Sequence, residues 1–146
     1  RMKDHLKELY KEKQFIFENN FLLLEQELLL IDQKINEKVN FITNKTFIVS
    51  HPAWSYFSKR YSLEQLSIEQ ESKETGIRAR KELLEIAKEQ QITTVFYQTR
   101  INTKSAKLFA DEIGAKLIKL DPLKYDHVAN LQETADLIIQ SLSNKL

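Results

Sequence analysis

The chain has 146 residues, enough for one domain with its own hydrophobic core and few for two. Its net charge of +1 offers no electrostatic argument for a nucleic-acid or anionic-membrane partner. Cysteine is absent, which excludes disulfides, thiolate metal sites and cysteine nucleophiles. The apolar runs, such as residues 28–31, are far too short to span a membrane.

The first 40 residues contain neither Gly nor Pro. Apolar side chains recur three or four residues apart from Phe17 to Ile35, which predicts a helix over Lys13–Val39, about 40 Å long at roughly 1.5 Å per residue. Further leucines widen the apolar stripe, so we expect burial on more than one side; a coiled-coil seam is the alternative. A short helix over Met2–Tyr10 precedes it. Since the chain opens with Arg1 inside this helical pattern, we expect a fragment whose parent continues upstream.

The hydrophobic period changes after residue 44. Strands are predicted at Lys45–Ser50, Glu64–Ile68, Ile92–Tyr97 and Ala115–Leu120, and helices at Trp54–Tyr61, Gly76–Gln90, Lys104–Ile113 and Asp126–Leu142. Strands that alternate with helices predict an α/β fold: a long N-terminal helix followed by a four-stranded parallel sheet with helices on both faces. The expected division is a helical segment, 1–42, and an α/β lobe, 43–146.

Some details of the helices are also predictable. Thr103 is an N-cap and Gly114 stands at the expected C′ position of one helix. The helix over Gly76–Gln90 has one apolar face, which we expect to point inward through Ile77, Leu83, Leu84, Ile86 and Ala87. Trp54, Phe57 and Tyr61 share a face of the short helix, typical of core packing.

Polar side chains follow the predicted strands, where open parallel sheets bind their ligands. The first strand leads to His51; the later strands lead to Glu69, Glu71 and the 72–75 turn, then to Gln98 and Arg100, and finally to Asp121, Asp126 and His127. Imidazole and carboxylate together suit zinc or manganese. His51 is therefore a candidate metal ligand. The alternative is a partly buried histidine that only packs and bonds to a loop carbonyl.

The other candidates each have a structural explanation. Asp126 is a good N-cap for the last helix, and Asp121 before Pro122 is typical of a turn. His127 fits first-turn surface, and His5 lies in a charged helical stretch where we expect exposure.

Catalysis has less support. Ser50 and His51 are neighbours in an extended segment and so point to opposite faces, and two glycines in the whole chain disfavour a phosphate-binding loop. Two rival functions remain open. One is an α/β module that binds a small molecule or a protein, with His51 structural. The other is a hydrolase with His51 and Glu69 or Asp126 as acid and base, which requires a closed apolar pocket around His51.

The segment FIVSHPAWSYF, residues 47–57, together with the Lys-Glu turn and the Asp-Pro-Leu at 121–123, resembles a known family. These motifs are similar to those of the second lobe of zinc and manganese substrate-binding proteins of bacterial ABC transporters. The resemblance runs from about Tyr10 to Leu137. Ser55, Ser62 and Ser72 stand where the family usually has glycine.

The resemblance implies two α/β lobes joined by one long rigid helix, with the metal held between them. This chain would then be that helix and the C-terminal lobe, without the N-terminal lobe that supplies two histidine ligands. His51 matches the histidine of the second lobe, and Asp126 approximates an aspartate that many members use. Gln98 stands where manganese-binding members have a glutamate, which favours zinc over manganese.

The implied function is capture of zinc by a periplasmic or otherwise extracytoplasmic receptor, with an ABC-transporter permease as partner and no nucleic acid. It is binding and not enzymatic catalysis. With one histidine and one carboxylate, we expect the fragment alone to bind zinc weakly, and less well below about pH 6 because protonated imidazole cannot ligate. Self-association through apolar surface left by the absent lobe is also expected.

Overall fold

The computed structural model describes residues 1–70, 73–74, 76–98 and 103–143. Six α-helices lie in this part of the chain: α1 (Met2–Leu9), α2 (Gln14–Asn40), α3 (Ser55–Arg60), α4 (Ile77–Glu89), α5 (Thr103–Ile113) and α6 (His127–Leu142), with a 3₁₀ turn, η1 (Lys11–Lys13), before α2. The strands are β1 (Thr46–Val49), β2 (Glu64–Ser67), β3 (Glu69–Gln70), β4 (Lys73–Glu74), β5 (Thr94–Tyr97) and β6 (Lys116–Lys119).

Four strands form one parallel sheet in the order β2-β1-β5-β6, as predicted. From β1 the chain moves outward to β2 and then returns past β1 to reach β5. The direction of strand order therefore reverses between β1 and β5, where Ile48 lies opposite Val95 and Val49 opposite Phe96. This is the switch point at which such sheets place their ligands.

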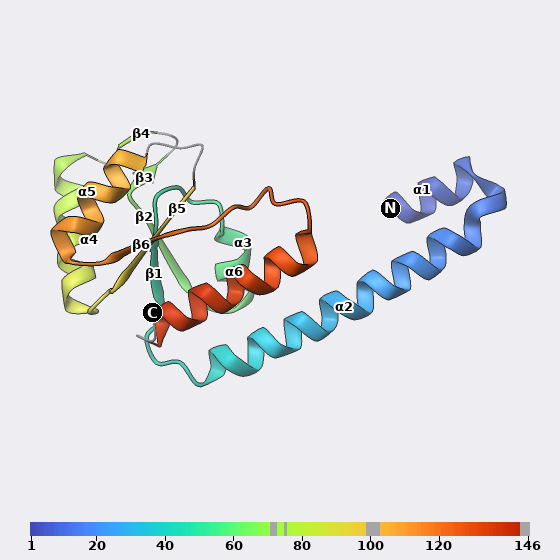
Figure 1. Ribbon diagram of the computed structural model, residues 1–146, viewed down its shortest axis with the longest axis horizontal. Coiled ribbons are helices and arrows are strands. Elements are labelled where there is room, and N and C mark those ends of the chain that lie inside the picture. The colour runs from blue at the N-terminus through green and yellow to red at the C-terminus, as the bar shows by residue number, and fades with distance from the viewer. Residues whose placement is uncertain (71–72, 75, 99–102, 144–146) are drawn as a thin grey trace.

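Successive residues of the central strands point to opposite faces of the sheet, and each face has its own core. Phe47, Val49 and Phe96 pack with α2, α3 and α6, whereas Ile48 and Val95 pack with α4 and α5. Figure 1 shows the resulting three layers, with α4 and α5 on the left of the sheet and α6 and the end of α2 on the right. The predicted helices on both faces are confirmed.

The long helix α2 belongs to the lobe only at its C-terminal end. Ile31, Ile35 and Val39 are buried against α6 and the sheet, whereas residues 21–30 are all exposed. Figure 1 shows the first part of α2 projecting away from the lobe, with α1 folded back along it. The expectation that this helix is buried on several sides does not hold for residues 2–30, the arm, because the arm extends beyond the lobe.

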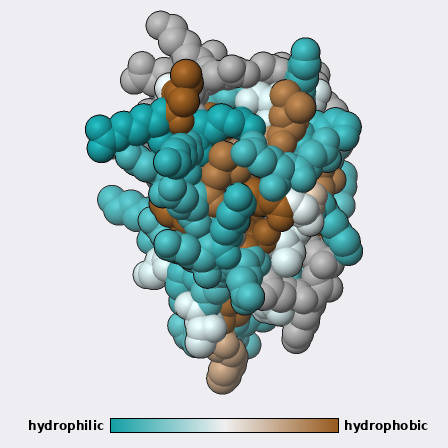
Figure 2. Space-filling view, turned by 90° about the vertical axis from the view of Figure 1, so that its left-hand side faces the viewer, coloured by the Kyte–Doolittle hydropathy of each residue, from teal (hydrophilic) through white to brown (hydrophobic). Residues whose placement is uncertain are grey.

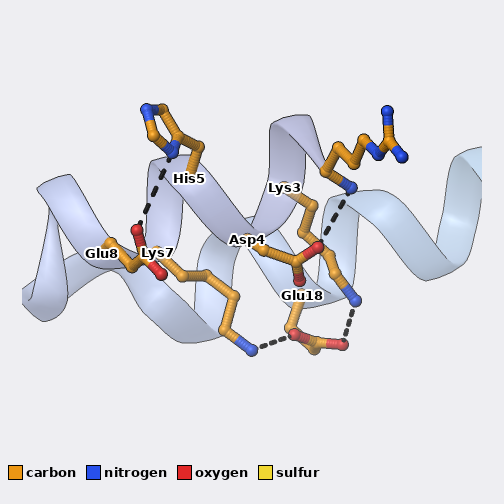
Figure 3. Close-up of polar contacts among 7 residues, drawn as sticks. Lys3, Asp4, His5, Lys7, Glu8 and Glu18 are labelled. Carbon is orange, nitrogen blue, oxygen red and sulfur yellow. Dashed lines mark hydrogen bonds and ion pairs between the residues drawn. The ribbon is translucent and has the colours of Figure 1, made fainter.

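Ionic contacts hold α1 on α2. Lys3 and Lys7 both donate to Glu18, at 2.9 and 2.5 Å (Figure 3). Because all three groups are partly exposed, this attachment depends on salt.

The side of the lobe formed by α4 and α5 is largely hydrophilic (Figure 2). Ion pairs one helical turn apart cover it, such as Arg78–Glu82 and Lys107–Asp111, both at 3.0 Å. Ile77 does not point inward as predicted: it is 92% exposed, because it is the first residue of α4 and lies beyond the buried part of that helix. Within the described ranges, no helix is both long and apolar enough to cross a bilayer.

A small antiparallel hairpin follows β2 and was not predicted. Glu69 of β3 lies opposite Glu74 of β4, and β3 follows β2 after the single residue Ile68. Residues 72 and 75 of the predicted turn lie outside the described residues. Elsewhere the expected helix end at Gly114 is confirmed, with φ of 70° at a residue that lacks the Cβ penalty for that conformation.

Candidate metal-binding site

His51 lies two residues beyond β1, at the switch point of the sheet. Two backbone hydrogen bonds from Ser50 anchor the chain just before it: its N–H donates to Phe96 O (2.7 Å), and its carbonyl accepts from Glu69 N (3.1 Å). The imidazole is half-buried. The structure thus places His51 at the predicted edge of the sheet. The backbone just before it is bonded to β5 through Phe96 and to β3 through Glu69.

Several contacts constrain the chain from Ser50 to Trp54, the histidine loop. Pro52 has a fixed φ and favours an extended conformation in the residue before it. Ala53 N–H donates to His51 O at 2.8 Å, which closes a tight turn. Trp54 N–H then donates to the side-chain Oε1 of Gln65 on β2, also at 2.8 Å.

Gln98 follows β5 and meets His51 at the switch point. Both residues line one small gap, without room for a water molecule, together with Ser50, Trp54 and Tyr97. Three polar atoms there, Ser50 Oγ, His51 Nδ1 and Gln98 Nε2, are buried with no hydrogen-bond partner in the part of the chain that the structure describes. Buried polar groups are nearly always paired, so this concentration of unpaired atoms marks the switch point as unusual.

The two carboxylates proposed beside His51 occupy different places. Glu69 is 4% exposed, in β3, and its backbone reaches the histidine loop. Asp126 is exposed and caps α6, with Oδ1 accepting from Ala129 N at 3.0 Å. Figure 1 shows α6 starting well away from the carboxyl end of β1. Over the described residues, no hydrogen bond joins His51 to either carboxylate, and Asp126 as a ligand stays a prediction.

The remaining polar candidates have local roles. Asp121 Oδ1 accepts from Leu123 N at 3.1 Å, the turn contact expected before Pro122. His127 is exposed at the start of α6, and His5 is exposed and near Glu8, with Nδ1 3.7 Å from its carboxylate (Figure 3). Glu71 and Arg100 lie outside the described residues.

The described residues contain no group of three or more His, Asp or Glu side chains able to hold a metal ion together. An imidazole such as that of His51 can supply one ligand of a zinc site, which takes four. Any complete metal site that uses His51 therefore needs ligands from outside the part of the chain that the structure describes, or from water.

The far end of α3 is tied to α2 by a cluster that sequence reasoning did not identify. Arg60 Nε and a terminal nitrogen contact the two oxygens of Asp32 at 2.9 and 2.5 Å, and the Tyr61 hydroxyl donates to Asp32 at 2.9 Å. The hydrogen bond from Arg60 holds the pKa of the Asp32 carboxyl below its usual range. Burial, with the hydrogen bond to Asp32, raises the pKa of Tyr61 to about 12.

Known proteins resemble this chain over most of its length. Residues 1–142 match the model of a family described as "Zinc-uptake complex component A periplasmic". The zinc-binding lipoprotein AdcA of Streptococcus pneumoniae is 26% identical over 125 residues, which cover 84% of this chain and 25% of that protein. A putative metal-binding protein of Treponema pallidum is 28% identical over 87 residues, covering 58% of this chain and 28% of that protein.

Solved structures share the fold. The crystal structure of ZnuA superposes with a TM-score of 0.90 at 35% identity and covers 97% of this chain, which matches 55% of the ZnuA chain. A zinc-bound variant of AdcAII from Streptococcus pneumoniae gives 0.83 at 26% identity, covering 97% of this chain and 54% of that one. The chain thus spans about a quarter of the length of the curated AdcA relatives and about half of these solved chains.

Proposed function

The chain belongs to the family of zinc-uptake complex component A proteins, and we propose that it is the connecting helix and C-terminal lobe of an extracytoplasmic zinc receptor that serves an ABC transporter. The observation that carries this proposal is the position of His51. Its half-buried imidazole lies at the switch point of the parallel sheet, on a loop fixed by hydrogen bonds to two strands.

His51 supplies one neutral nitrogen to zinc, and a second lobe completes the site. Two relatives support zinc as the metal: AdcA is described as a zinc-binding lipoprotein, and the AdcAII variant is described as zinc-bound. Asp126, or water, is a candidate for a further ligand. The chemistry is capture and release of a metal ion that then passes to a membrane permease, with no bond made or broken in a substrate.

The arm offers a surface for the second lobe. Leu22, Leu23, Leu29 and Leu30 are 46–62% exposed and lie on one side of the helix. Phe21, Leu24 and Leu28, which are 38–45% exposed, lie on the opposite side. A helix that is apolar all round is normally buried in protein. A groove of about 470 Å³ runs beside it, lined by Phe21, Leu24, Leu28 and other residues down to Asp32 and Arg60. We assign this surface to the N-terminal lobe; when that lobe is absent, the same surface favours self-association of the chain.

A titration with Zn²⁺ followed by NMR at the three histidine rings tests the proposal. His5 and His127 are both exposed and serve as internal references for weak surface binding. We expect the His51 ring resonances to shift at a lower zinc concentration than those of His5 or His127. If all three rings respond together, or His51 does not respond, the proposed role of His51 is wrong.

A further inference from the structure

Gln65 is a polar residue of β2 that lies beside the hydrophobic core on one face of the sheet. It lies opposite Phe47 in the register of the parallel sheet, on the face that packs against α2, α3 and α6. Its side chain is half-buried and polar. A polar amide at such a position costs free energy unless its donor and acceptor are both paired.

Both ends of the Gln65 amide contact the start of α3. Oε1 accepts from Trp54 N–H at 2.8 Å, and Nε2 donates to Ser55 Oγ at 3.3 Å. Trp54 is the N-cap residue of α3, and its own side chain makes no capping hydrogen bond. The glutamine on the neighbouring strand therefore fixes the point at which the histidine loop becomes helix.

Only two residues, Pro52 and Ala53, separate Trp54 from His51. The proline restricts its own φ and the conformation of His51, and the Ala53 N–H to His51 O bond closes the turn. Little torsional freedom remains between the two residues. A displacement of the Trp54 backbone is consequently passed to the imidazole of His51.

We infer that Gln65 is a positioning residue for His51, acting through the backbone of the histidine loop; its consequence for zinc rests on the proposed function. The described hydrogen bonds of the loop comprise backbone bonds at Ser50, Ala53 and Trp54 O, and two bonds that use a side chain: Ser58 Oγ donates to Trp54 O at 3.1 Å, and Trp54 N–H donates to Gln65. Of these two, the bond to Gln65 joins the loop to a neighbouring strand, so a substitution at Gln65 removes that link while the sheet, the turn and α3 keep their backbone bonds.

The test compares two substitutions of Gln65. Gln65→Met keeps the length of the side chain and removes the acceptor. Gln65→Glu keeps an acceptor oxygen for Trp54 N–H and can accept from the Ser55 hydroxyl. Ser55→Ala removes only the weaker contact. Gln33→Met is the matched control, because Gln33 is exposed on α2 and its side chain donates to Glu37, at 2.9 Å, far from the histidine loop. Circular dichroism melts show whether each variant is folded.

Two NMR readouts follow: the order of the His51 ring from relaxation, and the apparent Zn²⁺ affinity at that ring. For Gln65→Met we expect greater ring mobility, faster exchange of the Trp54 amide, and a zinc affinity about tenfold weaker, the lower end of what loss of an outer-shell partner costs. Gln65→Glu should restore ring order, and Ser55→Ala and Gln33→Met should stay close to wild type.

The inference is overturned if Gln65→Met is folded and leaves the order of the His51 ring unchanged, or if Gln33→Met alters it equally. An unchanged zinc affinity alongside a mobile ring also contradicts the positioning role. If wild-type His51 shows no response to zinc, the proposed function fails instead, and the ring order alone decides whether Gln65 positions His51.

Discussion

At the residue scale, Tyr61 shows how the fold alters the chemistry of a single side chain. The residue is 8% exposed and packs edge-on against Phe57, with ring centroids 4.8 Å apart. Its hydroxyl is directed at Asp32, whose charge opposes formation of a second anion nearby. Both burial and this neighbour favour the protonated phenol.

Stability should therefore fall at alkaline pH because of Tyr61. Its pKa rises from 10.0 to about 12 on folding, so between these values the unfolded chain has lost the proton that the folded chain keeps. The contribution is fully present below pH 10 and decreases as the pH rises through this window, by on the order of 1–2 kcal/mol. Urea unfolding at pH 9 and pH 11 measures it.

The matched pair is Tyr61→Phe and Tyr125→Phe, since Tyr125 is 98% exposed. Tyr61→Phe should lower stability at pH 9 and lose less between pH 9 and 11 than wild type does. Tyr125→Phe should keep the wild-type decrease. Equal decreases in the two variants would show that Tyr61 does not carry this dependence.

The positions of some residues in the site could be predicted from the sequence, and those of others could not. His51 and Gln98 follow two strands of a parallel sheet, and the rule about carboxyl ends predicted that they share an edge. Asp32 and Gln65 carried no such signal, because Asp32 and Arg60 are 28 residues apart and Gln65 reads as an ordinary strand residue. Contacts of this kind depend on how helices and strands pack, which no local pattern encodes.

At the element scale, α2 has two parts with different energetic roles. Its last turns pack into the core through Ile31, Ile35 and Val39, whereas the arm shares no core with the lobe. Stability of the lobe should accordingly depend on the end of the helix and not on its beginning. The predicted boundary at residue 42 lies between the helical segment and the first strand. The hydrophobic core contains residues from both sides of this boundary.

Ile35→Ala tests this difference, because Ile35 is fully buried. We expect the free energy of unfolding to fall by about 2–5 kcal/mol, the usual cost of emptying a core isoleucine site. Leu29→Ala, at a side chain 62% exposed, should change it by less than about 0.5 kcal/mol. Denaturant unfolding followed by far-UV circular dichroism gives both values, and a large loss for Leu29→Ala would mean that the arm is part of the core.

The helices and the four parallel strands were predictable because each has a clear hydrophobic period or a β-branched run. The strand bounds differ by a few residues: the third strand was expected from Ile92 and begins at Thr94. The β3–β4 hairpin was missed since two-residue strands have no period to detect. The apolar period of the arm indicates burial without saying which body provides it, so the burial predicted from that period was wrong for the arm. The projection (Figure 1) agrees instead with the resemblance, which implies a helix that connects two lobes.

At the scale of the whole molecule, the proposed receptor divides its metal site between this lobe and a second one. The switch point presents one imidazole, the described residues assemble no metal cluster, and the arm leaves leucines uncovered. These three observations agree with the proposal that a second lobe packs on the arm and completes the site. They also explain why zinc binding by the chain alone should be weak.

Calorimetric titration of Zn²⁺ into variants that differ only at His51 tests whether this imidazole is a zinc ligand. Replacing His5 and His127 with Gln removes the two exposed imidazoles and leaves His51 alone; a second variant carries His51→Ala in addition. We predict weak binding in the first variant and its loss in the second. A tight, stoichiometric zinc complex that is unaffected by His51→Ala would show that His51 is not the zinc ligand of this lobe.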